Sequence, residues 1–88
     1  MKTLYAPHVF LKQAIKRMKV TKQMEETLMD CHERELMGLE PYEVASTRHA
    51  KELLARGLLE VKEHFLERGK KILAIFVSDL GRKYLSSL

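Results

Sequence analysis

Residues 46–61 read STRHAKELLARGLLEV, and this stretch decides the fold that we expect. Ser46 is a favourable N-cap residue, and apolar residues follow it at helical spacing. The residues predicted to form the buried side of this helix are Ala50, Leu53 and Leu54. Gly57 suits the left-handed position that closes a helix. The stretch therefore predicts a helix that starts at Ser46, ends at Gly57 and leads into a different element.

After Gly57 the apolar residues alternate with polar ones, which is typical of a strand. Leu59, Val61 and Phe65 are predicted to face the core, whereas the polar residues between them (Glu60, Lys62 and His64) face outward. Residues 67–71 (ERGKK) predict a basic turn, and residues 72–77 (ILAIFV) predict the returning strand. Ser78 is a predicted N-cap of a last helix. The apolar residues of that helix are Leu80, Tyr84, Leu85 and Leu88.

Two more helices are predicted before the opening stretch. Residues 7–19 form one, and residues 22–37 form another that Thr21 caps and Gly38 ends. Residues 41–45 leave room for about one helical turn. The predicted order is helix, helix, short turn, helix, hairpin and helix, which is a mainly α chain with a small β-hairpin (α+β). We expect one domain at residues 21–88, preceded by a basic amphipathic helix within residues 1–20.

Charge is segregated along the chain, although the net charge is only +4. Residues 1–22 carry six bases and no acid, residues 23–45 carry seven acids and one base, and residues 46–88 carry nine bases and five acids. Basic ends favour a polyanionic partner. The alternative is that the basic and acidic segments pair with each other or are simply solvated.

Composition excludes several classes of protein. No apolar run approaches the roughly 20 residues that span a bilayer, so we expect no membrane segment. The single cysteine, Cys31, excludes an internal disulfide framework and favours a reducing, cytoplasmic compartment.

From residue 21 to residue 85 the chain resembles the winged helix-turn-helix family of DNA-binding proteins, including MarR-like and related small regulators. STRHAKELLARGLLEV looks like a recognition helix followed by the first wing strand. IFVSDLGRKYL (residues 75–85) is similar to the last wing strand and the helix start that follows it. The resemblance implies a winged-helix fold and sequence-specific binding of double-stranded DNA. The implied role is that of a small transcriptional regulator that acts by occupying an operator.

The resemblance also implies which residues contact DNA. Those near the start of the helix are Thr47, Arg48, His49, Lys51 and Glu52, and those at the wing turn are Arg68, Lys70 and Lys71. Arg48 would make a bidentate contact to guanine, and Lys51 would bind phosphate. The wing cations would lie along a minor groove or the flanking phosphates. The alternative is that Arg48 and Lys51 are ordinary solvated side chains.

The N-terminal helix has an apolar side made of Phe10, Leu11, Ile15 and Met18. We predict that this side forms a homodimer, because a two-fold partner would bury it and leave the lysines in water. The half-sites of such a dimer would be separated by about 10 base pairs. One alternative is that the lysines of this helix extend the contact with DNA, and another is that the helix packs back on the core of its own chain.

A second hypothesis is a winged-helix protein-interaction module, such as an adaptor or host-takeover factor. The compression of the usual second helix into residues 38–45, together with Glu52, favours it. Enzymatic activity is not expected: Cys31, His32 and Glu33 are consecutive, so they point about 100° apart around a helix and do not converge on one atom. The histidines have no metal-ligand spacing. We therefore expect no metal, no cofactor and no small-molecule substrate.

Overall fold

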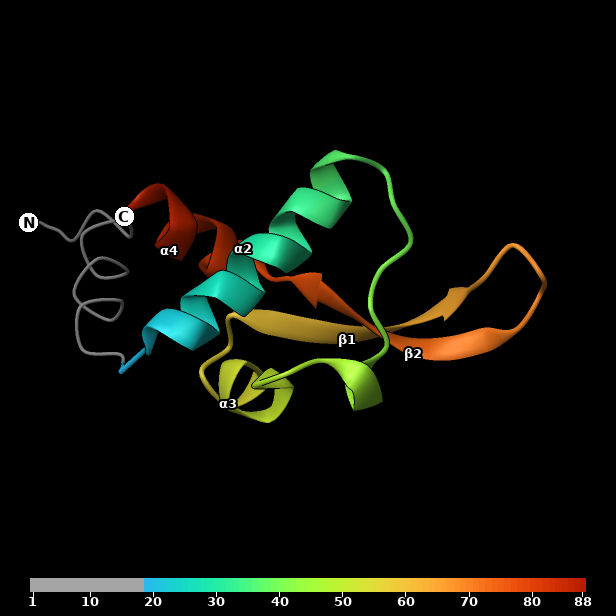
Figure 1. Cartoon of the computed structure of the whole chain (residues 1–88), viewed down its shortest axis with the longest axis horizontal. Coiled ribbons are helices and arrows are strands. Elements are labelled where there is room, and N and C mark those ends of the chain that lie inside the picture. The colour runs from blue at the N-terminus through green and yellow to red at the C-terminus, as the bar shows by residue number, and fades with distance from the viewer. Residues whose placement is uncertain (1–18) are drawn as a thin grey trace, which may run out of the picture.

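The elements along residues 19–88, the part of the chain that the computed structural model describes, follow the predicted order (Figure 1). They are α2 (Lys22–Leu36), the 3₁₀ helix η1 (Val44–Ser46), α3 (Ala50–Ala55), β1 (Leu59–Phe65), β2 (Lys71–Val77) and α4 (Asp79–Ser86). This confirms a small α+β fold with an antiparallel hairpin. Residues 7–18 of the first predicted helix lie outside the described residues, and Lys19, its predicted last residue, is not helical.

Helix α2 begins where its cap was predicted. The Thr21 side-chain oxygen accepts the Met24 N–H at 3.2 Å, which satisfies one of the free donors at the helix start. Met24, Leu28 and Cys31 follow at helical spacing and are buried. Glu35 continues the same side of the helix, and its carboxylate accepts the backbone N–H of Val77 at 2.6 Å. The backbone N–H of Val77 in β2 therefore satisfies the Glu35 carboxylate, which explains why a charged residue lies on the buried side of α2.

Strand β2 has neighbours along both edges. One edge pairs with β1, and on the other Glu43 forms an isolated bridge with Ala74. The carbonyl of Tyr42 accepts the Ile75 N–H at 3.0 Å. The Arg34 guanidinium of α2 lies 4.1 Å from the centre of the Tyr42 ring and also donates to the Glu40 carbonyl, which holds the connecting loop against α2.

The start of α3 differs from the prediction. The helix begins at Ala50 rather than after Ser46, and Ser46 belongs to η1. The hydroxyls of Ser46 and Thr47 donate to the Glu43 carbonyl at 3.2 and 2.7 Å, so they close η1 instead of capping α3. His49 takes the N-cap position in a left-handed conformation, with φ of 60°. As a result α3 is only six residues long.

The end of α3 agrees with the prediction. Gly57 has φ of +72°, a conformation that glycine adopts without a steric penalty. Its N–H donates to the Leu54 carbonyl, and the next N–H, that of Leu58, donates to the Leu53 carbonyl, both at 3.0 Å. This pair of hydrogen bonds is a Schellman motif, which satisfies the last carbonyls of the helix and turns the chain into β1.

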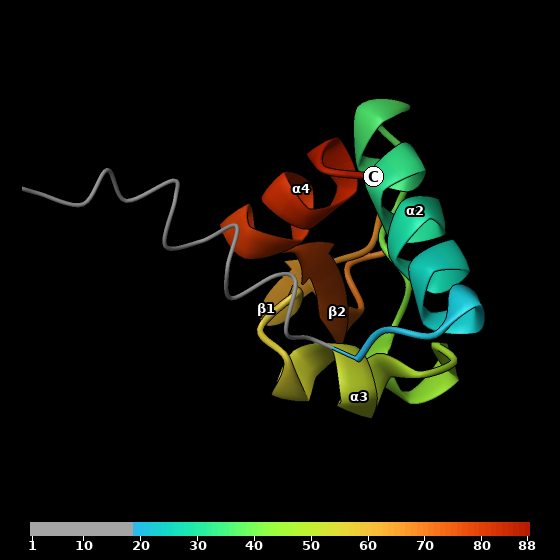
Figure 2. The same cartoon turned by 90° about the vertical axis from the view of Figure 1, so that its left-hand side faces the viewer.

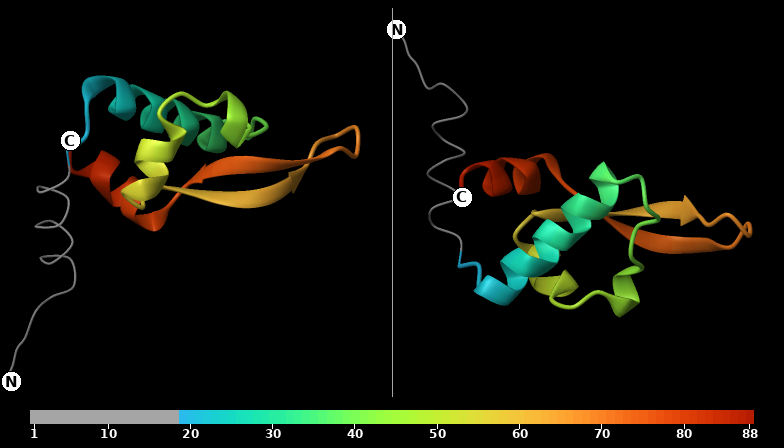
Figure 3. Two further views of the ribbon diagram at one scale, coloured as in Figure 1. Left: turned by 90° about the horizontal axis from the view of Figure 1, so that it is seen from below. Right: turned by 45° about the horizontal axis from the view of Figure 1, so that its top comes forward.

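The hairpin has the expected alternation, but the face that carries Leu59 is covered only at one end. The register runs from Leu59 opposite Val77 to Phe65 opposite Lys71. Leu59 is buried, whereas Val61 and Phe65 are 41% and 67% exposed, so their predicted burial is wrong. The helices surround one end of the hairpin (Figure 2), and its other end projects beyond them (Figure 3).

The outward face of β1 carries the predicted residues, but two of them, Glu60 and His64, are half-buried. His64 is half-buried, with its ring edge-on to Phe76 at 6.2 Å between centroids. The Lys62 ammonium lies 5.4 Å from the centre of the same Phe76 ring. These two side chains of β1 shield an aromatic ring of β2 on the face away from the core.

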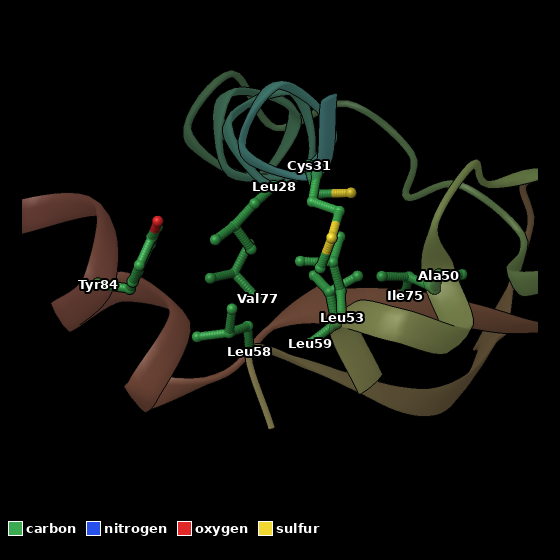
Figure 4. Close-up of a cluster of buried hydrophobic side chains, with 10 residues drawn as sticks. Leu28, Cys31, Ala50, Leu53, Leu58, Leu59, Ile75, Val77 and Tyr84 are labelled. Atoms are coloured by element: carbon green, nitrogen blue, oxygen red, sulfur yellow. The ribbon is translucent and has the colours of Figure 1, made fainter. Parts of the chain in front are cut away.

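The core lies where α2, α3 and α4 meet the covered end of the hairpin (Figure 4). Its fully buried side chains include Leu28, Leu53, Leu58, Ile75 and Val77. Helix α4 joins it as predicted: the Ser78 hydroxyl oxygen accepts the Gly81 N–H at 2.9 Å. Tyr84 is buried, and its hydroxyl donates to the Glu25 carboxylate at 2.5 Å, which ties α4 to α2.

Candidate nucleic-acid interface

The predicted DNA-contacting residues lie in two places that are separated along the molecule. One is the turn before α3 and the first turn of α3, and the other is the turn of the hairpin (Figure 1). In the first group only Lys51 and Glu52 are helical, because α3 starts at Ala50. Thr47, Arg48 and His49 precede the helix, so the predicted recognition helix does not carry them.

The turn before α3 is fixed by local hydrogen bonds. The Thr47 hydroxyl donates to the Glu43 carbonyl, as described above. His49 Nδ1 lies 2.9 Å from a carboxylate oxygen of Glu52, and this hydrogen bond is the largest cause of a lowered pKa for Glu52. Glu52 is exposed and therefore stays ionised well below neutral pH.

Arg48 is exposed and lies between two hollows next to α2. The hollows have volumes of about 210 and 220 Å³, and both are also lined by Thr27 and Asp30 of α2. Glu26 lines the second one. Two carboxylates near a guanidinium lower the local positive potential. Arg48 can therefore reach a polyanion, but it does so beside the acidic side of α2.

The hairpin turn presents its cations more openly. Arg68 and Lys70 are exposed, and neither has a carboxylate partner within residues 19–88. Lys71 is different, because its ammonium pairs with Glu63 of β1 at 3.3 Å. The turn is closed by the Leu66 N–H, which donates to the Lys70 carbonyl at 2.8 Å. Two of the three predicted wing cations are thus available to phosphates.

The acidic loop before η1 reaches this turn. The Glu40 carboxylate accepts the backbone N–H of Glu67 at 3.3 Å. It places a negative charge near the base of the turn and opposes the cations of the turn. The hairpin turn is therefore a local pair of cations rather than a strongly basic surface.

The overall charge of residues 19–88 is balanced, with twelve bases and twelve acids. All of the net charge of +4 is contributed by residues 1–18, which contain four bases and no acid. Non-specific affinity for nucleic acid comes mainly from neutralised phosphates. Within residues 19–88, an interface must therefore rely on a few well-placed cations.

Two surface features were not predicted. Exposed apolar side chains on the hairpin, Val61, Phe65 and Leu73, lie on one face of the two strands. A second apolar set lines a groove between α2 and α4 and includes Met29 and Leu88. The signal for the first was that two seven-residue strands are long for a core supplied by three short helices. The signal for the second was that the apolar residues of α2 extend beyond its buried side (Met24, Leu28 and Cys31) to Met29.

The Cys31 side chain is part of the hydrophobic core. Burial raises the pKa of the Cys31 thiol to about 11, with Asp30 and Glu35 adding to the shift, so the thiol is protonated at neutral pH. A protonated thiol is a poor nucleophile and a poor metal ligand. Residues 19–88 hold no group of three or more His, Cys, Asp or Glu side chains that could bind a metal ion. In the same residues no helix has the length and apolar character needed to cross a membrane.

The residues predicted to form a dimer, Phe10, Leu11, Ile15 and Met18, lie outside the described residues.

Comparisons of the chain with protein-family models, with curated proteins and with solved structures each found no match.

Proposed function

We propose that this protein binds double-stranded DNA as a winged-helix domain and acts as a small transcriptional regulator by occupying its operator. The observation that carries the proposal is the hairpin turn, which projects beyond the helices and presents Arg68 and Lys70 to solvent (Figure 3). The order of helix, η1, α3 and hairpin supports it, because a winged helix has a short helix before its recognition helix and a hairpin after it. Lys51, exposed on α3, adds a third cation.

The proposed contacts divide into two kinds. Arg68 and Lys70 bind backbone phosphates, as does Lys51, and these contacts set affinity and its dependence on salt. Arg48 is the residue that can read a base edge, because a guanidinium matches the two acceptors of guanine in the major groove. A contact of this kind discriminates against the wrong base by about 1–3 kcal/mol.

The test of phosphate binding is fluorescence anisotropy with random-sequence duplex DNA at increasing salt concentration. Each phosphate contact contributes about 0.9 to the slope of log affinity against log salt, so an Arg68→Ala, Lys70→Ala double variant should lower the slope by about two. The matched control is a Lys22→Ala, Lys83→Ala double variant. It removes the same charge from exposed lysines of α2 and α4, and it should leave the slope nearly unchanged. Equal losses in both variants would show that only net charge matters, and would overturn the assignment of the hairpin turn.

Specificity is tested separately, by selecting preferred sequences with the wild-type chain and with Arg48→Ala. The variant should lose preference at one base pair while keeping its affinity for random DNA. An Asp30→Asn variant removes a carboxylate next to Arg48 and should strengthen binding. The absence of any DNA binding by the wild-type chain at low salt would overturn the proposed function.

A second candidate function is a protein-interaction module. The specific observation in its favour is the apolar set Val61, Phe65 and Leu73 on the hairpin, which are 41%, 67% and 55% exposed. Exposed apolar groups that cluster on one face mark interaction sites more often than solvent-facing surface. A Leu73→Glu variant that keeps DNA binding but loses binding to an isolated protein partner would assign this face to that partner.

A further inference from the structure

A groove between α2 and α4 takes no part in the proposed DNA contacts. It has a volume of about 440 Å³, and its apolar lining comes from Met29 of α2, Leu85 of α4 and Leu88. Met29 and Leu88 are 47% and 64% exposed. Figure 2 shows α2 and α4 side by side on the same end of the hairpin. The groove is therefore an apolar surface on a small domain that gains stability if another segment covers it.

Charged residues also line the groove. Glu33 of α2 is exposed and has no ion-pair partner among residues 19–88, whereas Arg82 of α4 is paired with Asp79. Helix α2 as a whole carries five acids and two bases. An occupant that fits this surface combines apolar side chains for Met29 and Leu88 with cations for Glu33 and the acidic helix α2.

We propose that the groove is the docking site of the N-terminal segment of the same chain, residues 1–18. The segment supplies the required chemistry: its apolar residues are Phe10, Leu11, Ile15 and Met18, and it carries Lys12, Lys16 and Arg17 without any acid. All twelve acids of the chain lie within residues 19–88, whereas every charged residue within residues 1–18 is a base. The charges of the segment and of α2 are therefore complementary.

The segment starts close enough to reach the groove. The described chain begins at Lys19, whose carbonyl accepts a hydrogen bond from the Arg56 side chain at 2.6 Å, and α2 follows from Lys22. Met29 is seven residues further along α2, which corresponds to about 10 Å. An extended chain covers about 3.5 Å per residue, so the residues before Lys19 can return along α2 without strain.

Occupation by the same chain is favoured over occupation by a second copy. A short tether gives the segment an effective concentration in the millimolar range, which exceeds that of a separate molecule in dilute solution. This reverses the preference for a dimer that the sequence alone gave. The inference does not depend on DNA binding, so either can fail without the other.

The experiment places one fluorescent reporter in the segment of the full-length chain. The chain has no tryptophan, so a Phe10→Trp variant reports on residue 10 alone. The expected result is blue-shifted emission and a severalfold lower acrylamide quenching constant than that of a peptide of residues 1–18 with the same substitution. Both properties should stay constant from micromolar to submillimolar protein.

Two substitutions then identify the site. Met29→Glu and Leu88→Glu, each combined with Phe10→Trp, should return the quenching constant to the value of the peptide. Both positions are exposed, so folding is retained, and circular dichroism checks this. Leu73→Glu is the matched control: it changes an apolar residue of similar exposure on the hairpin and should leave the reporter protected.

Three outcomes would overturn the proposal. A reporter that is exposed at every concentration shows that the segment does not dock. Protection that grows with concentration identifies a second copy as the occupant. Protection that survives both groove substitutions places the segment elsewhere on the domain.

Discussion

The two strands of the hairpin differ more in their surroundings than in their length. β2 lies between β1 on one edge and residues 42–43 on the other, with α2 packed over it, and Ile72, Ala74, Ile75 and Val77 are buried. β1 pairs only with β2 within residues 19–88, and Leu59 is its one buried residue. The sequences reflect this: ILAIFV is continuously apolar, whereas LEVKEHF places charges along an open edge.

This difference shows that alternation and burial are separate properties. Alternation follows from backbone geometry, so it correctly placed Leu59, Val61 and Phe65 on one face. Burial requires another element over that face. A continuously apolar strand indicates cover on both faces, and charges along a strand are a common protection for an open edge.

The largest expected effect is the difference in stability between two truncations to alanine, one at Ile75 and one at Val61. The two residues lie directly opposite each other on the same face, but they are 2% and 41% exposed. Ile75→Ala should lower the free energy of unfolding by about 2–5 kcal/mol, because it leaves a cavity in the core. Val61→Ala should cost about 1 kcal/mol or less, because much of its side chain is already in water. Urea unfolding measures both, and equal losses would contradict the different environments of the two strands.

A smaller effect is expected at the glycines that follow the two strands. A Cβ atom at Gly81, in α4 after β2, would overlap with the Leu58 carbonyl oxygen. Gly81→Ala should therefore force α4 away from the hairpin and cost about 1–3 kcal/mol. Gly69, in the turn after β1, has open space around it but φ of +83°, so Gly69→Ala should cost about 1 kcal/mol through the backbone alone.

Thermal unfolding and the near-ultraviolet circular dichroism spectrum separate these two causes. Gly81→Ala should change the aromatic spectrum through the displacement of Tyr84, whereas Gly69→Ala should leave it unchanged. A Gly81→Ala chain as stable as wild type would show that α4 does not approach the Leu58 backbone closely.

The smallest effect concerns the hydrogen bond between the two helices next to β2. Tyr84→Phe removes the donor to Glu25 and should cost about 1 kcal/mol at neutral pH. Burial, followed by the hydrogen bond to Glu25, raises the pKa of Tyr84 to about 12. An unfolded tyrosine ionises near 10, so this stabilisation is present below pH of about 10 and is lost as the pH rises toward 12.

The check is the free energy of unfolding of wild type and Tyr84→Phe across the alkaline range. The difference between them should shrink above pH of about 10, because the wild-type phenol then loses its preference for the folded state. Tyr42→Phe serves as the control, since no hydrogen bond of its hydroxyl is present among the described residues. A difference that grows with pH would contradict the direction of the shift.

Much of the fold was predictable because local signals and tertiary packing agree. Thr21 and Ser78 cap helices in the sequence pattern and in the structure. The prediction failed at Ser46, because its hydroxyl is within reach of the Glu43 carbonyl and serves η1 instead. A cap residue shows only that a helix can start at that position. The competing partner, here the Glu43 carbonyl, becomes known once the turn before the helix has been placed in the structure.

The candidate site was predicted in part. The sequence named the cations of the hairpin turn, but it did not show that Lys71 would be paired with Glu63 while Arg68 and Lys70 would be free of carboxylates in the described domain. It also did not place Arg48 beside Asp30, which is 18 residues away along the chain. Contacts between separate elements determine which charges remain available.

The sequence by itself determined the order of the elements, the ends of α2, the start of α4, the turn at Gly57 and the faces of the strands, whereas Leu88, which was expected on the last helix, lies beyond its end at Ser86. These depend on interactions within a few residues, such as caps, left-handed glycines and alternation. Only the tertiary structure decided which strand is covered, that Glu35 binds the backbone of β2, and that α2 and α4 leave a groove open. These depend on distances between residues far apart in the chain, which become fixed when the helices pack on the hairpin.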